Sequence, residues 1–280
     1  MPDTVPIVSI LLPTWNGALH IRNAVESVLA QTYTNWELII IDDGSDDQTK
    51  TATAISLFLA DSRILYLKNE KNLGIQKTLN RGLEQAKGLY IARIDDDDIW
   101  SDATKLAQQV EFLEQRPNYV LVGTGVVMVD EDGNELIRYL LPQDDTSIRK
   151  KILGKNCFVH SSVLFKKDAV QRAGGYDESK NILHLEDYDL WLKLGTIGKF
   201  ANLSLYATTF TLRSEGLSSK NKIQQAKKTL SLAKKYKKDY PGYLFAIIRS
   251  VVRLIVYGFI VQFPIKVFVN RLAKWYKEHW

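Results

Sequence analysis

Short apolar runs alternate with amphipathic segments along the first part of this chain. The apolar runs, each about the length of one strand and bounded by turn residues, are residues 8–12, 37–41, 64–67 and 90–94. The segments between them place apolar residues at helical spacing and are residues 20–30, 46–60 and 74–86. Continuous apolar strands are typical of sheets buried on both faces, and their alternation with helices predicts βαβ units. We therefore expect an α/β fold with a mostly parallel sheet flanked by helices.

The pattern becomes mixed after a predicted helix at residues 102–115. Short strands are predicted at residues 119–129, 135–141, 163–165 and 199–201. The first two are joined by a hairpin turn at 130–134. Further helices are predicted at residues 168–173 and 186–194. The second of these helices begins on the acidic pair Glu186 and Asp187, at the end of a helix where the dipole favours negative charge.

The C-terminal stretch is helical in pattern but differs from the rest in its side chains. Residues 219–240 include eight lysines at positions typical of a helix. Residues 243–263 are apolar apart from Arg249 and Arg253 and a few uncharged polar residues. These two arginines are four positions apart, so they share one face of the helix.

Formal charge divides the chain in the same place. From residue 219 onward there are 14 Lys and Arg and two acids, a balance of +12, whereas the whole chain carries +5. The preceding residues are therefore acidic overall, and an acidic body joined to a basic tail indicates two roles. We expect one domain at residues 1–218 and a basic, then amphipathic helical tail at residues 219–280.

Three loops follow predicted strands at the edge where ligands usually bind. They are residues 13–17, 42–45 and 95–98. The carboxyl ends of parallel strands meet at one edge of a sheet, and ligands of such sheets bind in the crevice there. We therefore expect the polar and acidic side chains of these loops to face one cleft.

Four consecutive aspartates occupy the third of these loops. Because like charges repel, Asp95 to Asp98 need a partner to converge between a strand and a helix start. A hard divalent cation such as Mg²⁺ or Mn²⁺ takes oxygen ligands and often completes its shell with substrate phosphates. The alternative is a charged loop that only caps the next helix. These residues alone leave both interpretations open.

Cysteine and histidine content limits the remaining chemistry. The single Cys157 excludes an internal disulfide framework and fits a reducing cytoplasm. Four histidines and one cysteine disfavour a zinc site of the usual ligand types. The first residues, Met1 to Thr4, carry no basic start and lead directly into a strand, so we expect no signal peptide.

An ordered set of motifs resembles the family-2 glycosyltransferases of GT-A fold. The motifs are the strand and loop at 8–16, Ile41-Asp42-Asp43-Gly44-Ser45, Asn72-Leu73-Gly74, the strand and acids at 90–98, His160-Ser161-Ser162-Val163, Gly174-Gly175-Tyr176-Asp177 and Glu186-Asp187-Tyr188-Asp189-Leu190-Trp191. Each motif alone is weak, but their order and spacing over residues 6 to 215 make the resemblance specific. It implies transfer of a sugar from a nucleotide-diphosphate donor to an acceptor hydroxyl, usually with inversion.

The resemblance also implies which residues bind the donor. The Asp-x-Asp motif falls on Asp95 and Asp97, which would bind the donor ribose and the Mn²⁺ or Mg²⁺ that bridges the diphosphate, with Asp96 between them. The residues implied in the donor and nucleobase pocket are Pro13, Thr14, Trp15, Asn16 and Asp43. Trp15 offers a face for stacking or else packs in the core. Asp43 offers an acceptor for a pyrimidine imide, which favours a UDP-sugar.

Asp187 becomes the implied general base, because an acceptor hydroxyl is a weak nucleophile until its proton is removed. Glu186 and His160 are implied near the acceptor side of the cleft, although both acids of the pair could equally be first-turn helix acids and His160 a structural residue. Where relatives often have Tyr-Arg-x-His, this chain has Leu212-Arg213-Ser214-Glu215. Arg213 keeps the implied diphosphate contact, while the Tyr and His are absent.

The tail suggests where the enzyme works. Arg249 and Arg253 make a spanning helix costly, and the preceding lysines favour a helix lying on an anionic membrane surface. A homodimer interface is the alternative, and no nucleic-acid-binding module is present. We expect a metal-dependent, hexosyltransferase-like enzyme at the inner face of the cell membrane, acting in polysaccharide or glycolipid assembly on an unknown acceptor that could be lipid-linked.

Two other functions compete with this one. A nucleotide-sugar-binding scaffold without turnover is kept open by the altered segment around Arg213. A nucleotidyltransferase of related architecture would need a Gly-rich phosphate loop with a basic residue after the first strand, and residues 13–17 supply neither.

Overall fold

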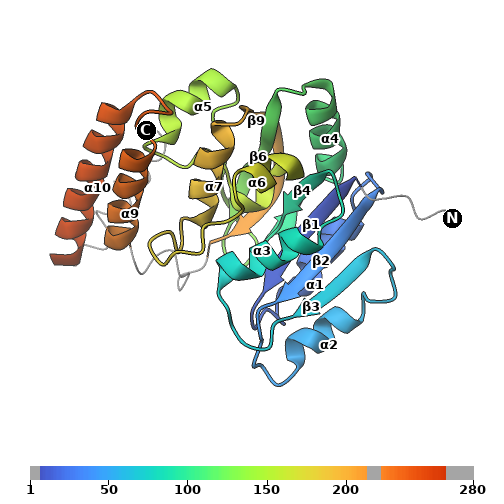
Figure 1. Ribbon diagram of the computed structural model, residues 1–280. Helices are drawn as coiled ribbons and strands as arrows, with labels where there is room; N and C mark the ends of the chain where they lie inside the picture. Colours follow the sequence, from blue (N-terminus) through green and yellow to red (C-terminus); the bar gives the residue numbers. More distant parts are fainter. Residues whose placement is uncertain (1–6, 213–221, 263–280) are drawn as a thin grey trace.

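A single nine-stranded sheet organises the protein in the computed structural model, which describes residues 7–212 and 222–262 (Figure 1). Its order is β3-β2-β1-β4-β8-β6-β9-β5, with β7 paired to β6. The first four strands along this path are parallel and comprise β3 (Ile64–Lys68), β2 (Trp36–Asp42), β1 (Val8–Thr14) and β4 (Tyr90–Arg93). The parallel half of the predicted α/β fold is confirmed.

The second half of the sheet is mixed, as the pattern predicted. Its strands are β5 (Ile99–Trp100), β6 (Tyr119–Val129), β7 (Glu135–Tyr139), β8 (Leu164–Lys166) and β9 (Lys199–Thr211). β8 is antiparallel to both β4 and β6, and β6 is parallel to β9. The strand predicted at residues 199–201 is only the start of β9, because its later residues are half-buried and carry no continuous apolar run.

Helices cover both faces of this sheet. They are α1 (Ile21–Leu29), α2 (Lys50–Ser56), α3 (Ile75–Gln85), α4 (Lys105–Gln115), α5 (Asp145–Ile152), α6 (Lys167–Arg172) and α7 (Glu186–Gly195), with a short 3-10 helix η1 (His160–Ser162). α2 is shorter than the predicted 46–60, because Gln48 and Thr49 adopt positive φ angles of 55° and 71° and so delay its start. α5 was not predicted.

The core lies in two layers, one on each side of the sheet. Val8, Ile10 and Leu12 of β1 pack into one layer together with α1 and α4, whereas Leu11 packs into the other with α3 and α7. All seven residues of β1 are buried. This two-sided burial is the physical reason for the continuous apolar run in the sequence.

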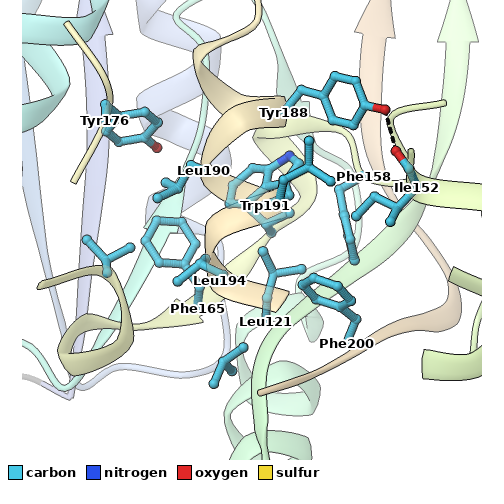
Figure 2. Packing of buried hydrophobic residues seen from close by; sticks show 14 of the residues in the cluster. Leu121, Ile152, Phe158, Phe165, Tyr176, Tyr188, Leu190, Trp191, Leu194 and Phe200 are labelled. Atoms are coloured by element: carbon cyan, nitrogen blue, oxygen red, sulfur yellow. Dashed lines mark hydrogen bonds between the residues drawn. The ribbon is translucent and has the colours of Figure 1, made fainter. Parts of the chain in front are cut away.

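α7 lies at the centre of the second layer. Trp191 is fully buried and contacts the rings of Phe158 and Phe165 edge-on, with centroids 6.0 and 5.7 Å away (Figure 2). The hydroxyl of Tyr188 donates to the carbonyl of Ile152 (Figure 2). These contacts fix α7, and therefore the position of the carboxylates in its first turn.

The C-terminal helices α9 (Lys222–Lys235) and α10 (Tyr243–Gln262) lie side by side at the end of the molecule away from α2 (Figure 1). α9 joins the core of α7, where Tyr236 donates to Asp189 and Tyr240 to the carbonyl of Leu192. Arg249 of α10 is 8% exposed, on the side that faces the body. The predicted boundary after residue 218 lies outside the described residues.

Candidate functional site

The first and third predicted loops are in direct contact. The hydroxyl of Thr14, at the end of β1, donates to Oδ2 of Asp96 over 2.5 Å. A Cβ atom at Gly17 would lie 2.0 Å from the same carboxylate oxygen. Only glycine leaves room there, so residue 17 sets how closely the two loops approach.

The first loop is also joined to the second. The backbone N–H of Asn16 donates to Oγ of Ser45 over 2.9 Å, and its side chain exchanges hydrogen bonds with Asp46. Asn16 holds a left-handed conformation with φ of 55°, which asparagine tolerates well. The adjacent Trp15 is 53% exposed and therefore does not pack in the core. Trp15 thus presents an exposed ring in the first loop.

Asp43 is buried and already accepts three hydrogen bonds. Its donors are the side chain of Asn69 and the backbone N–H groups of Leu73 and Gly74, at 2.8 to 2.9 Å. These bonds attach the loop after β3 to the end of β2. A structural role thus accounts for the carboxylate by itself, and its contact with a nucleobase stays a prediction.

Arg93 is a buried cation beneath the acidic loop. The residue is 1% exposed, and its guanidinium lies 2.5 Å from Oδ1 of Asp95. The other oxygen of Asp95 accepts from the hydroxyl of Ser161. Burial opposes ionisation of Asp95, but the charge of Arg93, together with the hydrogen bonds from Arg93 and Ser161, lowers the pKa of Asp95 below its usual value. Asp95 therefore stays ionised with both oxygens engaged.

The neighbouring carboxyls hold excess negative charge. Burial, reinforced by Asp95 and Asp97, raises the pKa of Asp96 to about 6 despite the bond from Thr14. Burial and Asp95 raise the pKa of Asp98 well above its usual value, and Oδ1 of Asp98 has no hydrogen-bond partner in the described part of the chain. Mutual repulsion of this kind is relieved by a bound cation.

These oxygens fit a divalent cation, although they do not enclose one. Within residues 7–212 and 222–262, no group of three or more His, Cys, Asp or Glu side chains is arranged to hold a metal ion. Mg²⁺ is commonly held by one or two carboxylates together with substrate phosphates, so such an enclosure is not required. The donor set, all oxygen with a buried orphan atom on Asp98, suits that mode.

Asp187 lies at the start of α7, next to the buried Glu186. The side chain of Asn156 donates to Oδ2 of Asp187 over 2.8 Å. Burial and then the Glu186 charge raise the pKa of Asp187 to about 7. The charge of Arg93 opposes this rise, and it also acts to lower the pKa of Asp95 and of Asp98.

His160 lies between these groups. Its Nε2 atom is 3.0 Å from the hydroxyl of Tyr176, and its ring meets Trp191 edge-on. Burial, with Arg93 nearby, lowers the pKa of His160 well below its usual value, so the ring is neutral. The structure therefore places His160 beside the acidic loop, fixed by aromatic contacts.

The sequence reasoning missed three polar residues of this site. Arg93 ends an apolar strand directly before the acids, a position where a charged side chain needs a partner. Ser161 stands in a motif of which only His160 was singled out, and Asn156 carried no signal of its own. Arg213 lies outside the described residues.

Known proteins resemble this chain in sequence and in fold. The model of the family described as "Glycosyl transferase family 2" matches residues 9–174. EpsE of Bacillus subtilis (strain 168), assigned as a glycosyltransferase, is 34% identical over 211 residues, which cover 75% of this chain and 74% of EpsE. AmsE of Erwinia amylovora, named as an amylovoran biosynthesis glycosyltransferase, is 34% identical over 68% of this chain and 70% of AmsE.

Two solved structures share the fold. S. aureus TarS in complex with UDP has a TM-score of 0.65 at 17% identity. The alignment covers 81% of this chain and 64% of the TarS chain. The mannosyltransferase PcManGT of Pyrobaculum calidifontis, in complex with GDP-Man and Mn²⁺, has a TM-score of 0.66 at 18% identity, with 98% of this chain covering 81% of that one.

Proposed function

This chain belongs to glycosyl transferase family 2, and from that premise we propose that it transfers a sugar, with inversion, from a nucleotide-diphosphate donor to an acceptor hydroxyl. The observation that carries the proposal is a chain of contacts that links two sets of carboxyls. Asp95 bonds to Ser161, and the adjacent His160 packs on Trp191 of α7. One set is the loop of Asp95, Asp96 and Asp98, and the other is the first turn of α7 with Asp187. One end of the site suits a diphosphate with its cation, and the other suits a general base.

Asp187 acts as the base in this proposal. As the acceptor oxygen forms its bond to the anomeric carbon, its proton moves to the carboxylate of Asp187. The bond from the anomeric carbon to the diphosphate breaks at the same time, and the nucleoside diphosphate leaves with the electron pair. A base with a pKa near the working pH combines an ionised resting state with a useful affinity for the proton.

The diphosphate end would be held by the acidic loop. Both oxygens of Asp95 are engaged by Arg93 and Ser161, so we assign the cation contact chiefly to the half-buried Asp97. A bound Mn²⁺ or Mg²⁺ supplies positive charge that stabilises the departing diphosphate. The exposed ring of Trp15 is positioned to stack on the base, and the UDP complex of TarS supports a UDP-sugar as the first donor to test.

An assay of nucleotide release separates this function from a scaffold that binds without turnover. Purified full-length chain is incubated with UDP-, dTDP- and GDP-sugars, with and without Mn²⁺, and free nucleoside diphosphate is measured. We expect release with one donor class, lost on chelation and in Asp97→Asn. The exposed carboxylate variant Asp168→Asn, in a surface ion pair, is the matched control. Tight donor binding without release in any condition would support the scaffold instead.

We place the reaction in polysaccharide or glycolipid assembly. AmsE, which is named for amylovoran biosynthesis, supports a polysaccharide product for a related chain. A lipid-linked acceptor is supported by the surface of α10, where the exposed apolar side chains include Leu244, Phe245, Ile248, Val251, Val252 and Ile255. In the part of the chain that the structure describes, no helix has the length and apolarity needed to cross a bilayer.

We therefore propose that α10 lies on the inner face of the cell membrane with this apolar surface against the lipid. Exposed lysines at the end of α9 adjoin it, and Lys237 lies 6.0 Å from the ring of Tyr243 at the start of α10. Apolar burial combined with lysines near anionic headgroups is the usual basis of interfacial binding.

Flotation with anionic vesicles tests the membrane contact. We expect Ile248→Ser with Ile255→Ser to abolish co-flotation, whereas Leu89→Ser, at a 65% exposed apolar residue elsewhere, leaves it intact. Unchanged flotation of the double variant, with a dimer that becomes a monomer in sedimentation, would assign the surface to a homodimer instead.

A further inference from the structure

Four basic side chains lie near the candidate base Asp187. They belong to two parts of the chain that are separate from the donor loops. Lys151 and Lys155 come from the end of α5 and the turn after it, and Arg249 and Arg253 come from α10. A Cβ at Gly154 would lie 3.3 Å from Cα of Ala246 and 3.4 Å from Cδ of Arg249, so α10 packs directly on this turn. Burial, and then Arg249, Lys151 and Arg253, lower the pKa of Lys155. Lys155 is therefore the residue on which the charges of the other three cations act.

The space around this cluster is open and poor in acids. A hollow of about 300 Å³ is bordered by Lys155, Asn156 and Arg253, and none of the described residues that line it is acidic. A second hollow of about 800 Å³ is bordered by Lys151, Lys155 and Asn156. Its one acid is Asp144, whose carboxylate already caps α5 by accepting from the N–H of Ser147. Lys155 and Asn156 thus border both hollows, and the residues that line these hollows carry more positive than negative charge.

Asn156 connects this cluster to the chemistry. It follows Lys155 in the chain, and its side chain donates to Asp187 over 2.8 Å. A ligand anchored on Lys155 therefore has its neighbouring groups within reach of the proposed base. The donor loops end β1, β2 and β4, whereas the cluster belongs to α5, the turn after it and α10, so it is separate from the donor loops.

We propose that Lys151, Lys155 and Arg253 form an anion subsite for the acceptor, which takes a phosphate or diphosphate ester close to the hydroxyl that Asp187 deprotonates. The inference rests on the proposed function for the role of Asp187. Several converging cations match the multiple charges and oxygens of a phosphate better than a single carboxylate would, and their hydrogen bonds to it are charge-assisted. Arg249, deeper in the cluster, adds field and packs the wall.

A phosphate ester can be presented by a lipid or by a soluble saccharide, and two probes distinguish these sources. With the donor site saturated by UDP and Mn²⁺, full-length chain is titrated with glycerol 3-phosphate and with monomeric dihexanoyl phosphatidic acid, and binding is followed by calorimetry. Binding of both probes assigns recognition to the phosphate itself. Binding of the lipid alone assigns it to a lipid-linked phosphate. Absence of binding by either probe overturns the proposal.

Single variants test the named residues. We expect Lys155→Gln and Arg253→Gln each to weaken probe binding about tenfold, equivalent to about 1.4 kcal/mol. Lys150→Gln, an exposed lysine in α5 outside the cluster, should bind the probe as the unmodified chain does. Melting temperatures check that each variant is folded. If UDP affinity falls as much as probe affinity, the cluster belongs to the donor site and the proposal is wrong.

Asp187→Asn separates this inference from the proposed function. It should abolish transfer but leave probe binding in place. Probe binding by a chain that never releases a nucleoside diphosphate would refute the transferase and keep the anion subsite. Sugar transfer that neither probe nor Lys155→Gln affects would refute the anion subsite and keep the transferase.

Discussion

At the scale of single residues, Arg93 decides the electrostatics of the site. It is the buried cation nearest to the acidic loop, and two of its guanidinium nitrogens, Nε and Nη1, have no hydrogen-bond partner among the described residues. Burying a guanidinium costs free energy unless carboxylates compensate it. Asp95 provides that compensation through a direct ion pair. The ion pair therefore positions Asp95 and keeps its carboxylate ionised.

We expect Arg93→Met to lower the free energy of unfolding by about 3–5 kcal/mol, because it leaves buried carboxylates without their counter-charge. Arg93→Lys keeps the charge but loses the forked guanidinium that reaches Asp95. Its free energy of unfolding should therefore lie between those of Arg93→Met and the unmodified chain. Urea denaturation measures both. The surface variant Arg172→Met, which breaks an exposed pair with Asp168, should change stability by less than about 1 kcal/mol. Equal effects for Arg93→Met and Arg172→Met would contradict this account.

The pH dependence of turnover should report Asp187. A general base works only as the carboxylate, so kcat/KM should be low in acid and rise with pH to a plateau, with a midpoint near the pKa of about 7. The hydrogen bond from Asn156 lowers that pKa, so Asn156→Ala should move the midpoint to higher pH. A rate that stays flat between about pH 5 and pH 8 would contradict a raised pKa for Asp187, since an aspartate of ordinary pKa is ionised throughout that range.

The sequence identified the residues of the site that belong to local motifs and missed those that depend on tertiary contact. Trp15, Asp95 and Asp187 could be placed from motif order, because each follows a strand or begins a helix. Asn156 and Ser161 act through bonds to residues 31 and 66 positions away, which no local pattern encodes.

At the scale of elements, the loop after β1 depends on one glycine. We expect Gly17→Ala to weaken UDP binding, because its Cβ would displace Asp96 and break the bond from Thr14. Calorimetric titration with UDP and Mn²⁺ measures the loss, for which we expect about tenfold, or 1.4 kcal/mol. Leu19→Ala, at a residue 86% exposed, is the control in the same segment. Unchanged UDP affinity in Gly17→Ala would show that this contact does not shape the donor site.

The strands that were predicted well are those buried on both faces. β1 and β2 contain the continuous apolar runs 10–12 and 38–41, because successive side chains of these runs meet the two core layers in turn. α5 escaped prediction because only Ile148 and Ile152 of its residues are buried, which leaves too short an apolar stripe to detect. β9 was underestimated because much of it is only half-buried, so packing and pairing with β6 define it more than composition does.

At the scale of the whole molecule, the basic C-terminal helices have unequal relations to the body. α9 contributes Leu232 and Ala233 to the core of α7, and Tyr236 follows directly after the helix, whereas much of α10 presents apolar side chains outward. Charge composition alone suggested one separable tail. Packing instead indicates that the first helix supports the transferase body and that the second supplies a surface.

Two truncations test this division. A chain ending at Tyr240 keeps α9, so we expect it to melt cooperatively but to lose binding to anionic vesicles. A chain ending at residue 218 uncovers the core around α7 and should lose cooperative melting. Differential scanning calorimetry and flotation provide the two readings. If the shorter chain melts cooperatively at the same temperature as the longer one, α9 does not support the body.

The most direct test is transfer by Asp187→Asn under conditions in which donor binding is measured on the same sample. The variant should bind UDP and Mn²⁺ as the unmodified chain does, while the rate of sugar transfer falls by about 10²–10⁴-fold, the usual contribution of a general base. Transfer by Asp187→Asn at a rate similar to that of the unmodified chain would contradict the account.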